Sequence, residues 1–328
     1  MNRPRSSTSM RQHAVITRGG PSKHLTRLRA IVRKHGFLYL LAVPGILYFL
    51  VFEYIPMFGI VIAFKDISPY NAVNDIFTGD WVGLQHLRRF FQSYYFWNIL
   101  GNTLIISGLK LLFGFPAPII LALLLNEVRN NRFKRIVQTI SYMPHFLSIV
   151  VVTSLITNLL SPSSGPINGL IQEFGGQPVS FLTNPSHFRS ILVVADVWQH
   201  VGWGTILYLA AIANVPQEFY ESAVIDGANR WQQARFITVP SISFVIVILL
   251  IFSIGSLLNA GFEQILLLYS PSVYSVADII DTHVYREGLI NLQYSYAAAV
   301  GLFKSILALL LLLAANKLAH KFGQPGIW

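Results

Sequence analysis

The sequence predicts an all-α protein that crosses a membrane about six times. Its 328 residues are 53% hydrophobic and only 12% charged, and the mean hydropathy is +0.54. A soluble globular chain carries about twice that charged fraction. The apolar residues gather in long runs, and about 20 such residues cross the hydrocarbon layer of a bilayer. Because the runs are continuous and do not alternate with polar residues, helices are favoured over the strands of a barrel.

Each of six apolar runs predicts one transmembrane helix. The runs cover residues 37–64, 98–125, 137–160, 189–213, 240–260 and 296–316. Prolines lie inside several of them, among them Pro116, Pro118 and Pro144, where a kink or a break is expected. The intervening segments 65–97 and 161–188 are rich in polar and aromatic residues, so we expect them outside the membrane. Residues 37–328 are therefore expected to form one transmembrane domain.

Residues 1–36 form a separate basic tail without an acidic residue. Between Leu25 and His35 the apolar residues share one face, which predicts a short helix at the membrane surface; a solvated tail is the alternative. Most of the 24 lysines and arginines lie in this tail and in the loops near residues 129–135, 230–235 and 317–321. An even number of spans places all of these on one side of the membrane.

The positive-inside rule assigns that basic side, and with it both termini, to the cytoplasm. The formal net charge of +10 is then explained by topology and by attraction to anionic membrane lipid. The sequence shows no motif that reads RNA or DNA, so no nucleic-acid partner is expected.

A polar, glycine-containing segment separates the fourth and fifth runs. Pro216 and Glu218 suit the start of a helix, and Gly227 can take the left-handed conformation that ends one. A second short helix is expected to continue to Pro240. The segment lies on the predicted cytoplasmic side, where a soluble partner can reach it; a connector helix resting on the membrane is the plainer alternative. Its candidate contact residues are Glu221, Ser222, Ala223, Asp226, Gly227 and Ala228.

The spacing Glu-x-Ala-x-x-Asp-Gly-Ala over 221–228, followed by Ile-x-x-Pro over 237–240, resembles the EAA loop of permease subunits of binding-protein-dependent ABC importers. One departure is Ser222, which stands where the motif has its first alanine; serine is small enough to keep docking. Three further stretches, 53–66, 278–305 and 321–328, resemble the polysaccharide branch of these permeases, which includes transporters of alginate and plant-cell-wall oligosaccharides. The resemblance covers residues 37–328.

This resemblance implies a transport subunit of the bacterial cytoplasmic (inner) membrane that is not an enzyme and binds no cofactor itself. Importers of the family combine two permease subunits, expected here to be different chains, with two cytoplasmic ATPase subunits that dock on the EAA loops and bind ATP and magnesium. An extracytoplasmic solute-binding protein delivers the poly- or oligosaccharide. The chain has no Gly-x-x-x-x-Gly-Lys-Ser/Thr phosphate loop, which agrees with this division of labour.

Polar side chains inside apolar spans are costly and usually face an interior or a cavity. The candidates for a substrate path are Asn102, Lys110, Asp196, Trp198, Gln199, His200, Asn259, Glu263 and Lys304. Trp198 and Tyr208 could stack on sugar rings. Lys110 and Lys304 could meet a carboxylated sugar, which motivates the hypothesis of an acidic, alginate-like saccharide. Pairing between helices, for instance of a lysine with Asp196, carries equal weight.

Two other function classes are alternatives to an ABC importer. An ion-coupled secondary sugar transporter would use Lys110, Asp196 or Lys304 to carry the ion or proton, but it does not need the cytoplasmic loop 216–240. A membrane-embedded enzyme is less favoured, because Ser107-x-x-Lys110 lies in an apolar span without companion motifs. The nine histidines lack metal-binding spacings and the sequence has no cysteine, so no metal site is expected.

Overall fold

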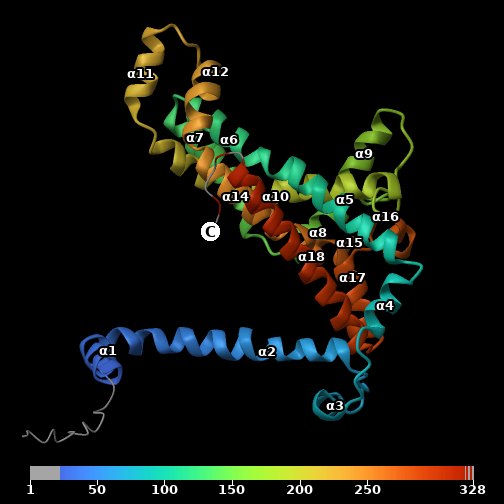
Figure 1. The fold of residues 1–328 in the computed structure, drawn as a ribbon. Coiled ribbons are helices and arrows are strands. Elements are labelled where there is room, and N and C mark those ends of the chain that lie inside the picture. Colours follow the sequence, from blue (N-terminus) through green and yellow to red (C-terminus); the bar gives the residue numbers. More distant parts are fainter. Residues whose placement is uncertain (1–22, 322, 324–325, 327–328) are drawn as a thin grey trace, which may run out of the picture. The chain divides into compact units, whose positions relative to one another are not determined.

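The computed structural model describes residues 23–321, 323 and 326 (Figure 1). Across these residues the chain is helical and has no strand; a single isolated bridge joins Lys65 and Trp81. The predicted all-α class is thereby confirmed. Contacts divide the chain into two compact units, Met1–Gly59 and Ile60–Trp328, which are described separately.

The first unit contains one long helix. It consists of α1 (Lys23–Phe49), a π-helical turn (Leu50–Tyr54) and α2 (Ile55–Met57). The π turn precedes Pro56, whose ring and missing N–H disturb the regular helical ladder. Residues Gly36–Phe64 are long and apolar enough to cross a membrane, as predicted for 37–64. Helix α1 includes the stretch predicted to lie at the membrane surface, and that location stays a prediction; residues 1–22 lie outside the described residues.

Two further helices of the second unit match predicted spans. Residues Phe96–Glu127, which comprise α5 (Phe96–Gly114) and α6 (Pro116–Glu127), and helix α18 (Tyr294–Lys321) are both long and apolar enough to cross a membrane. Helix α10 (Pro185–Ala213) corresponds to the run 189–213 and has 29 residues, about 44 Å at 1.5 Å per residue. It begins at Asn184, whose side chain accepts the Ser186 N–H.

The run 137–160 does not form one straight helix. Helix α7 (Asn131–Tyr142) passes into a 3₁₀ turn, η3 (Met143–Phe146), and α8 (Ile149–Leu159) then leaves at 104° to that axis. Pro144 cannot continue the α-helical ladder, and Ser148 starts the new helix by accepting the Val151 N–H. Helix α8 has 11 residues, about 16 Å, and by itself is too short to cross a bilayer.

The run 240–260 is broken as well. The segment from α12 (Arg230–Gln233) through a π turn, η4 (Ala234–Thr238), and α13 (Val239–Ser241) meets α14 (Ser243–Gly255) at 65°. After the 3₁₀ turn η5 (Leu257–Asn259), Ala260 and Gly261 have positive φ, and α15 (Phe262–Leu268) begins. Among the described residues there are three unbroken candidate spans, or up to five if each bent pair is one span. The count of six stays a prediction.

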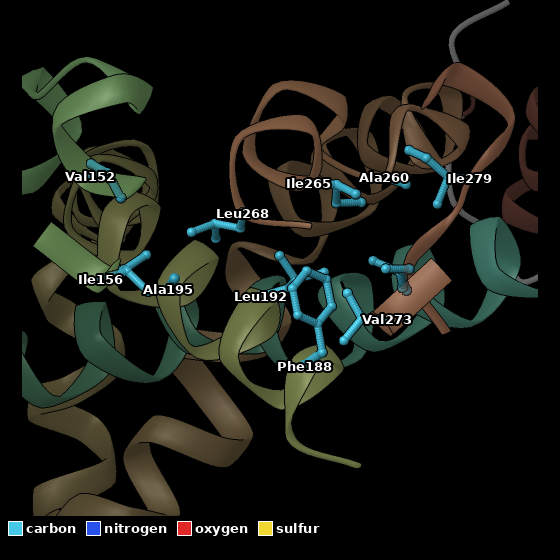
Figure 2. Close-up of a cluster of buried hydrophobic side chains, with 12 residues drawn as sticks. Val152, Ile156, Phe188, Leu192, Ala195, Ala260, Ile265, Leu268, Val273 and Ile279 are labelled. Atoms are coloured by element: carbon cyan, nitrogen blue, oxygen red, sulfur yellow. The ribbon is translucent and has the colours of Figure 1, made fainter. Parts of the chain in front are cut away.

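Helix α10 lies at the centre of the second unit and packs against α5, α6 and α7 (Figure 1). Shorter helices make up the connections: α3 (Ala72–Thr78), α4 (Gln85–Phe91), α9 (Pro166–Glu173), α11 (Gln217–Ile225), α16 (Tyr274–Ala277) and α17 (Ile280–Tyr285). The main apolar core joins α8, α10 and α15; Ile156, Leu192 and Ile265 belong to it (Figure 2). This core holds the broken helix 257–268 against α10.

Candidate functional site

The coupling hairpin, α11 and α12 with the turn between them, projects from one end of the second unit (Figure 1). Gly227 ends α11 with φ +79°. The N–H of Ala228 donates to the carbonyl of Ala223 at 2.8 Å, and the N–H of Gly227 to that of Val224 at 3.1 Å, which is a Schellman motif. The two short helices that the sequence predicts around Gly227 are therefore present.

Contacts at both ends of the hairpin hold it to the spans. Asn229 and Gln232 form a capping box that starts α12. The hydroxyls of Tyr220 and Thr238 lie 3.0 Å apart. The Arg230 guanidinium donates to the carboxylate of Glu127 at 3.2 Å and to its carbonyl at 3.0 Å, at the end of α6, where a cation also suits the helix dipole.

The outer surface of the hairpin is uncovered in this chain. No residue of α11 is buried, and Ile225 is 86% exposed. A cavity of about 280 Å³ lies between the two helices, lined by Ala223, Asp226, Gly227, Ala228, Gln232, Gln233, Phe236 and Ile237. Glu221 and Asp226 have no ion-pair partner within the described part of the chain. The exposed Ser222 hydroxyl donates to the Glu218 carbonyl, one turn earlier in α11, at 2.9 Å.

A second site, the central cavity, has a volume of about 470 Å³ and lies between α5, α10, α14 and the break before α15. The residues that line it are Ser107, Lys110, Leu111, Gly114, Phe115, Pro118, Asp196, Val197, His200, Val201, Trp203, Gly204, Leu207, Tyr208, Leu249, Phe252, Ser253, Ser256, Leu257 and Ala260. The structure therefore brings together three predicted path residues, Lys110, Asp196 and His200.

Lys110 is seated between two helices. Its ammonium lies 3.0 Å from Asp196 Oδ1 and donates to Gln264 Oε1 at 2.8 Å. A Cβ on Gly261, whose φ is +83°, would overlap the ammonium. The break between α14 and α15 therefore forms the position that the Lys110 ammonium occupies. Glycine at position 261 provides both the positive φ of the turn and the space for the ammonium. The interhelical pairing considered from the sequence is present.

His200 and Trp203 follow Asp196 on the same face of α10, at helical spacings of four and three residues. The Nδ1 atom of His200 lies 3.0 Å from the Asp196 carbonyl and 3.9 Å from its carboxylate. Trp203 is 46% exposed and lines the cavity. Trp203 is not among the path residues predicted from the sequence, although its position on the same face of α10 as Asp196 would have indicated that it lines the cavity.

Six of the nine predicted path residues do not line the central cavity, and three of these six lie within the fold or on another face of α10. Trp198 lies on another face of α10, where it lines two apolar cavities. Gln199 is buried and donates to the Leu147 carbonyl at the bend after η3. Asn102 is also buried; it donates to the Asp278 carbonyl at 3.0 Å and accepts from Arg189 at 2.7 Å. The hydrogen bonds of Gln199 and Asn102 connect separate elements of the fold.

Asn259 and Glu263 line a third space, the outer cavity, of about 720 Å³, and Lys304 contacts two of its lining residues without lining it itself. Lys304 lies 2.7 Å from both carboxylate oxygens of Asp281 and donates to Asn259 at 3.0 Å. The broken helix therefore contributes to two cavities, with Leu257 and Ala260 in one and Asn259 in the other. Both lysines proposed to meet a carboxylated sugar are already paired with a carboxylate of the protein.

A buried charge network lies near the outer cavity, on α17. Arg286 donates to both oxygens of Asp278, at 2.7 and 3.1 Å, and Thr282 donates to the same carboxylate at 2.7 Å. The hydrogen bond to Asp278 raises the pKa of Arg286. Burial, and then the positive charge of Arg286, lower the pKa of His283. The network joins Asp278, just before α17, to Arg286, just after it, and so connects the two ends of this short helix. No cluster of three metal-ligating side chains occurs in the described ranges.

Comparisons with known proteins agree on one family. Residues 114–324 match the family described as binding-protein-dependent transport system inner membrane component. Protein LplB of Bacillus subtilis (strain 168) is 48% identical over 299 residues, which cover 91% of this chain and 93% of that protein. The polygalacturonan/rhamnogalacturonan transport system permease protein YteP of the same organism is 49% identical over 315 residues, 96% of each chain.

Two solved structures have closely similar folds. A chain from a bacterial ABC transporter involved in the import of the acidic polysaccharide alginate superposes with a TM-score of 0.84 and 42% identity, covering 90% of this chain and 99% of its own. A chain from a bacterial alginate ABC transporter in complex with an alginate pentasaccharide-bound periplasmic protein gives a TM-score of 0.84 and 41% identity, covering 92% and 100%.

Proposed function

Because the chain belongs to the family of binding-protein-dependent transport system inner membrane components, we propose that it is a permease subunit of an ATP-driven saccharide importer. The central cavity is the observation that carries the proposal. It lies at a broken helix, where irregular backbone at membrane depth is tolerated because it lines a cavity. The site has the composition of a ligand pocket, mostly apolar with a few polar groups that converge.

The saccharide class follows from what these polar groups can do. Lys110 has two of its three donors directed at Asp196 and Gln264, so one is left for a sugar oxygen. The carboxylate of Asp196 balances the charge of Lys110. A hydroxyl or a carboxylate of the sugar can accept a hydrogen bond from the third N–H of the ammonium. Trp203 offers an aromatic face. The relatives named for polygalacturonan/rhamnogalacturonan transport and for alginate import support an acidic saccharide as the main cargo.

The partners in this proposal dock at opposite ends of the second unit. The coupling hairpin is the docking surface for a cytoplasmic ATPase, which binds ATP and magnesium. This role is supported by the exposed apolar side chains of the hairpin and by the carboxylates of Glu221 and Asp226, for which the described residues offer no ion-pair partner. A second, different permease subunit completes the pathway, and an extracytoplasmic solute-binding protein delivers the sugar. The complex lies in a bacterial cytoplasmic membrane with both termini of this chain inside.

Reconstitution of the chain with its co-purifying subunits in liposomes tests the proposal. Uptake of a uronate oligosaccharide and of a neutral one of equal length is measured with and without internal ATP. We expect uptake only with ATP and the binding protein, with the uronate preferred. Uptake driven by an ion gradient without an ATPase would instead support a secondary transporter. Equal uptake of both sugars would contradict the acidic preference alone.

A further inference from the structure

His145 lies on the 3₁₀ turn η3, and its ring packs flat against the indole of Trp203 on α10. The ring centroids are 4.6 Å apart and the planes differ by 5°. Phe146 meets the same indole edge-on, at 5.7 Å and 84°. Two consecutive residues of the bend therefore contact the Trp203 indole, His145 by stacking and Phe146 in a T-shaped arrangement, while 46% of Trp203 stays exposed and the residue lines the central cavity.

The packing of α7 against α10 brings the bend to this tryptophan. A Cβ on Gly202, the residue before Trp203, would collide with the Ser141 carbonyl, so glycine is what allows the close approach of the two helices. Pro144 then ends the helical ladder and turns the next residue toward the indole. His145 itself does not line the cavity.

One ring nitrogen of His145, Nδ1, is buried and makes no hydrogen bond to the described residues. An unpaired buried nitrogen costs stability, so the flat aromatic ring is the property of His145 that this position uses. His200, at 5.8 Å between centroids, is a second aromatic neighbour of His145 and lines the cavity.

We infer that His145 is a positioning residue for substrate recognition, one that fixes the Trp203 indole as a platform for a sugar ring in the central cavity. This inference rests on the proposed function. A sugar ring packs its C–H face on an aromatic plane, and a tryptophan already held in place loses less side-chain entropy when the sugar binds. His145 acts through Trp203 and does not itself touch the sugar.

Variants of His145 in the reconstituted complex test the inference. His145→Leu removes the ring and His145→Phe keeps it. We expect His145→Leu to raise the KM for saccharide uptake about two- to tenfold, the size of an aromatic pair contribution, with little change in kcat, and His145→Phe to restore the KM. His187→Leu is the matched control, because His187 packs edge-on against Phe181 (5.7 Å, 81°) away from the cavity; its KM should not change.

A double-mutant cycle with Trp203→Ala separates positioning from general damage. In the Trp203→Ala background, His145→Leu should have no further effect on the KM. We also expect His145→Leu alone to shift the tryptophan fluorescence emission, and this shift should be absent in the Trp203→Ala background. An equal rise in KM in both backgrounds, or a Trp203→Ala variant with unchanged KM, would overturn the inference while the proposed function stands. Absence of ATP-driven saccharide uptake by the unmodified complex would overturn the proposed function and the inference with it.

Discussion

The coupling hairpin and the central cavity are built in opposite ways. The hairpin is shaped by bonds between near neighbours, such as the Ala223–Ala228 bond and the Asn229–Gln232 capping box. The cavity is shaped by residues far apart in the sequence, such as Lys110 and Gln264, which are separated by 154 positions. On the exposed hairpin, Glu221 and Asp226 have no ion-pair partner in the described part of the chain, whereas Lys110 and Asp196 in the cavity are paired with each other.

This difference indicates where each site is sensitive. The hairpin should respond most to substitutions that change its own backbone, because few contacts outside it define its shape. The cavity should respond to substitutions that disturb the pairing between helices, even where the backbone is unchanged.

Gly227→Pro should abolish ATP-driven uptake. Proline holds φ near −65°, while Gly227 has φ +79° and its N–H closes the turn. The spans should stay folded, because the hairpin adds few contacts to them. Uptake and ATP hydrolysis of the reconstituted complex provide the measurement, and Gly227→Asn, which tolerates the left-handed conformation, is the control. Hydrolysis at the unmodified rate in the proline variant would refute a coupling role for this turn.

Lys110→Met should destabilise the protein, because it leaves the carboxylate of Asp196 without its ion-pair partner. An unpaired, mostly buried acceptor costs about 1–3 kcal/mol, and the Asp196 side chain is 26% exposed. The melting temperature in detergent reports the loss. Adding Asp196→Asn to Lys110→Met should recover part of the stability, since the neutral amide no longer needs a cation. Additive losses in the double variant would show that the pair is not coupled.

Gly261→Ala should displace the Lys110 ammonium and reduce uptake. The left-handed conformation costs a residue with a Cβ about 1–2 kcal/mol, and the new methyl would overlap Nζ. Gly301→Ala serves as the control, because nothing lies within 4 Å of its Cβ position. Uptake rates and melting temperatures of the two variants are compared. If both behave alike, Gly261 does not form the seat of Lys110.

Arg230→Ala should have the smallest effect. Its ion pair with Glu127 is half exposed, and such pairs contribute about 0.2–1 kcal/mol. We expect a small decrease in melting temperature that shrinks further at high salt, where exposed charges are screened. A loss as large as that of Lys110→Met would indicate that the tether to α6, rather than the local turn, defines the hairpin.

The sequence predicted where the helices lie more accurately than which helix faces line a cavity. The apolar runs and the hairpin at Gly227 followed from local patterns, and the structure has both. Trp198 was chosen because it is aromatic and next to polar residues, but it lies on another face of α10, whereas Trp203 shares the face of Asp196 and His200. Helical spacing contains that information; which face meets the cavity depends on where α5 and α14 pack.

The breaks in the third and fifth runs show the same limit. Pro144 was predicted to disturb a helix and Gly261 was not singled out, but both the 104° turn after η3 and the position of the Lys110 ammonium depend on helices that pack around these residues. Apolar content over twenty residues predicts membrane burial whether or not the helix is continuous. Hydropathy therefore located these runs without showing their breaks.

The helical class, the positions of the apolar runs and the turn of the coupling hairpin follow from local sequence, because each depends on interactions between residues a few positions apart. The pairing of Lys110 with Asp196 and of Lys304 with Asp281 depends instead on how the helices pack. An ion pair between helices requires two backbones to be packed at a defined distance. That distance is set by the core around α10 and α15, to which many distant residues contribute.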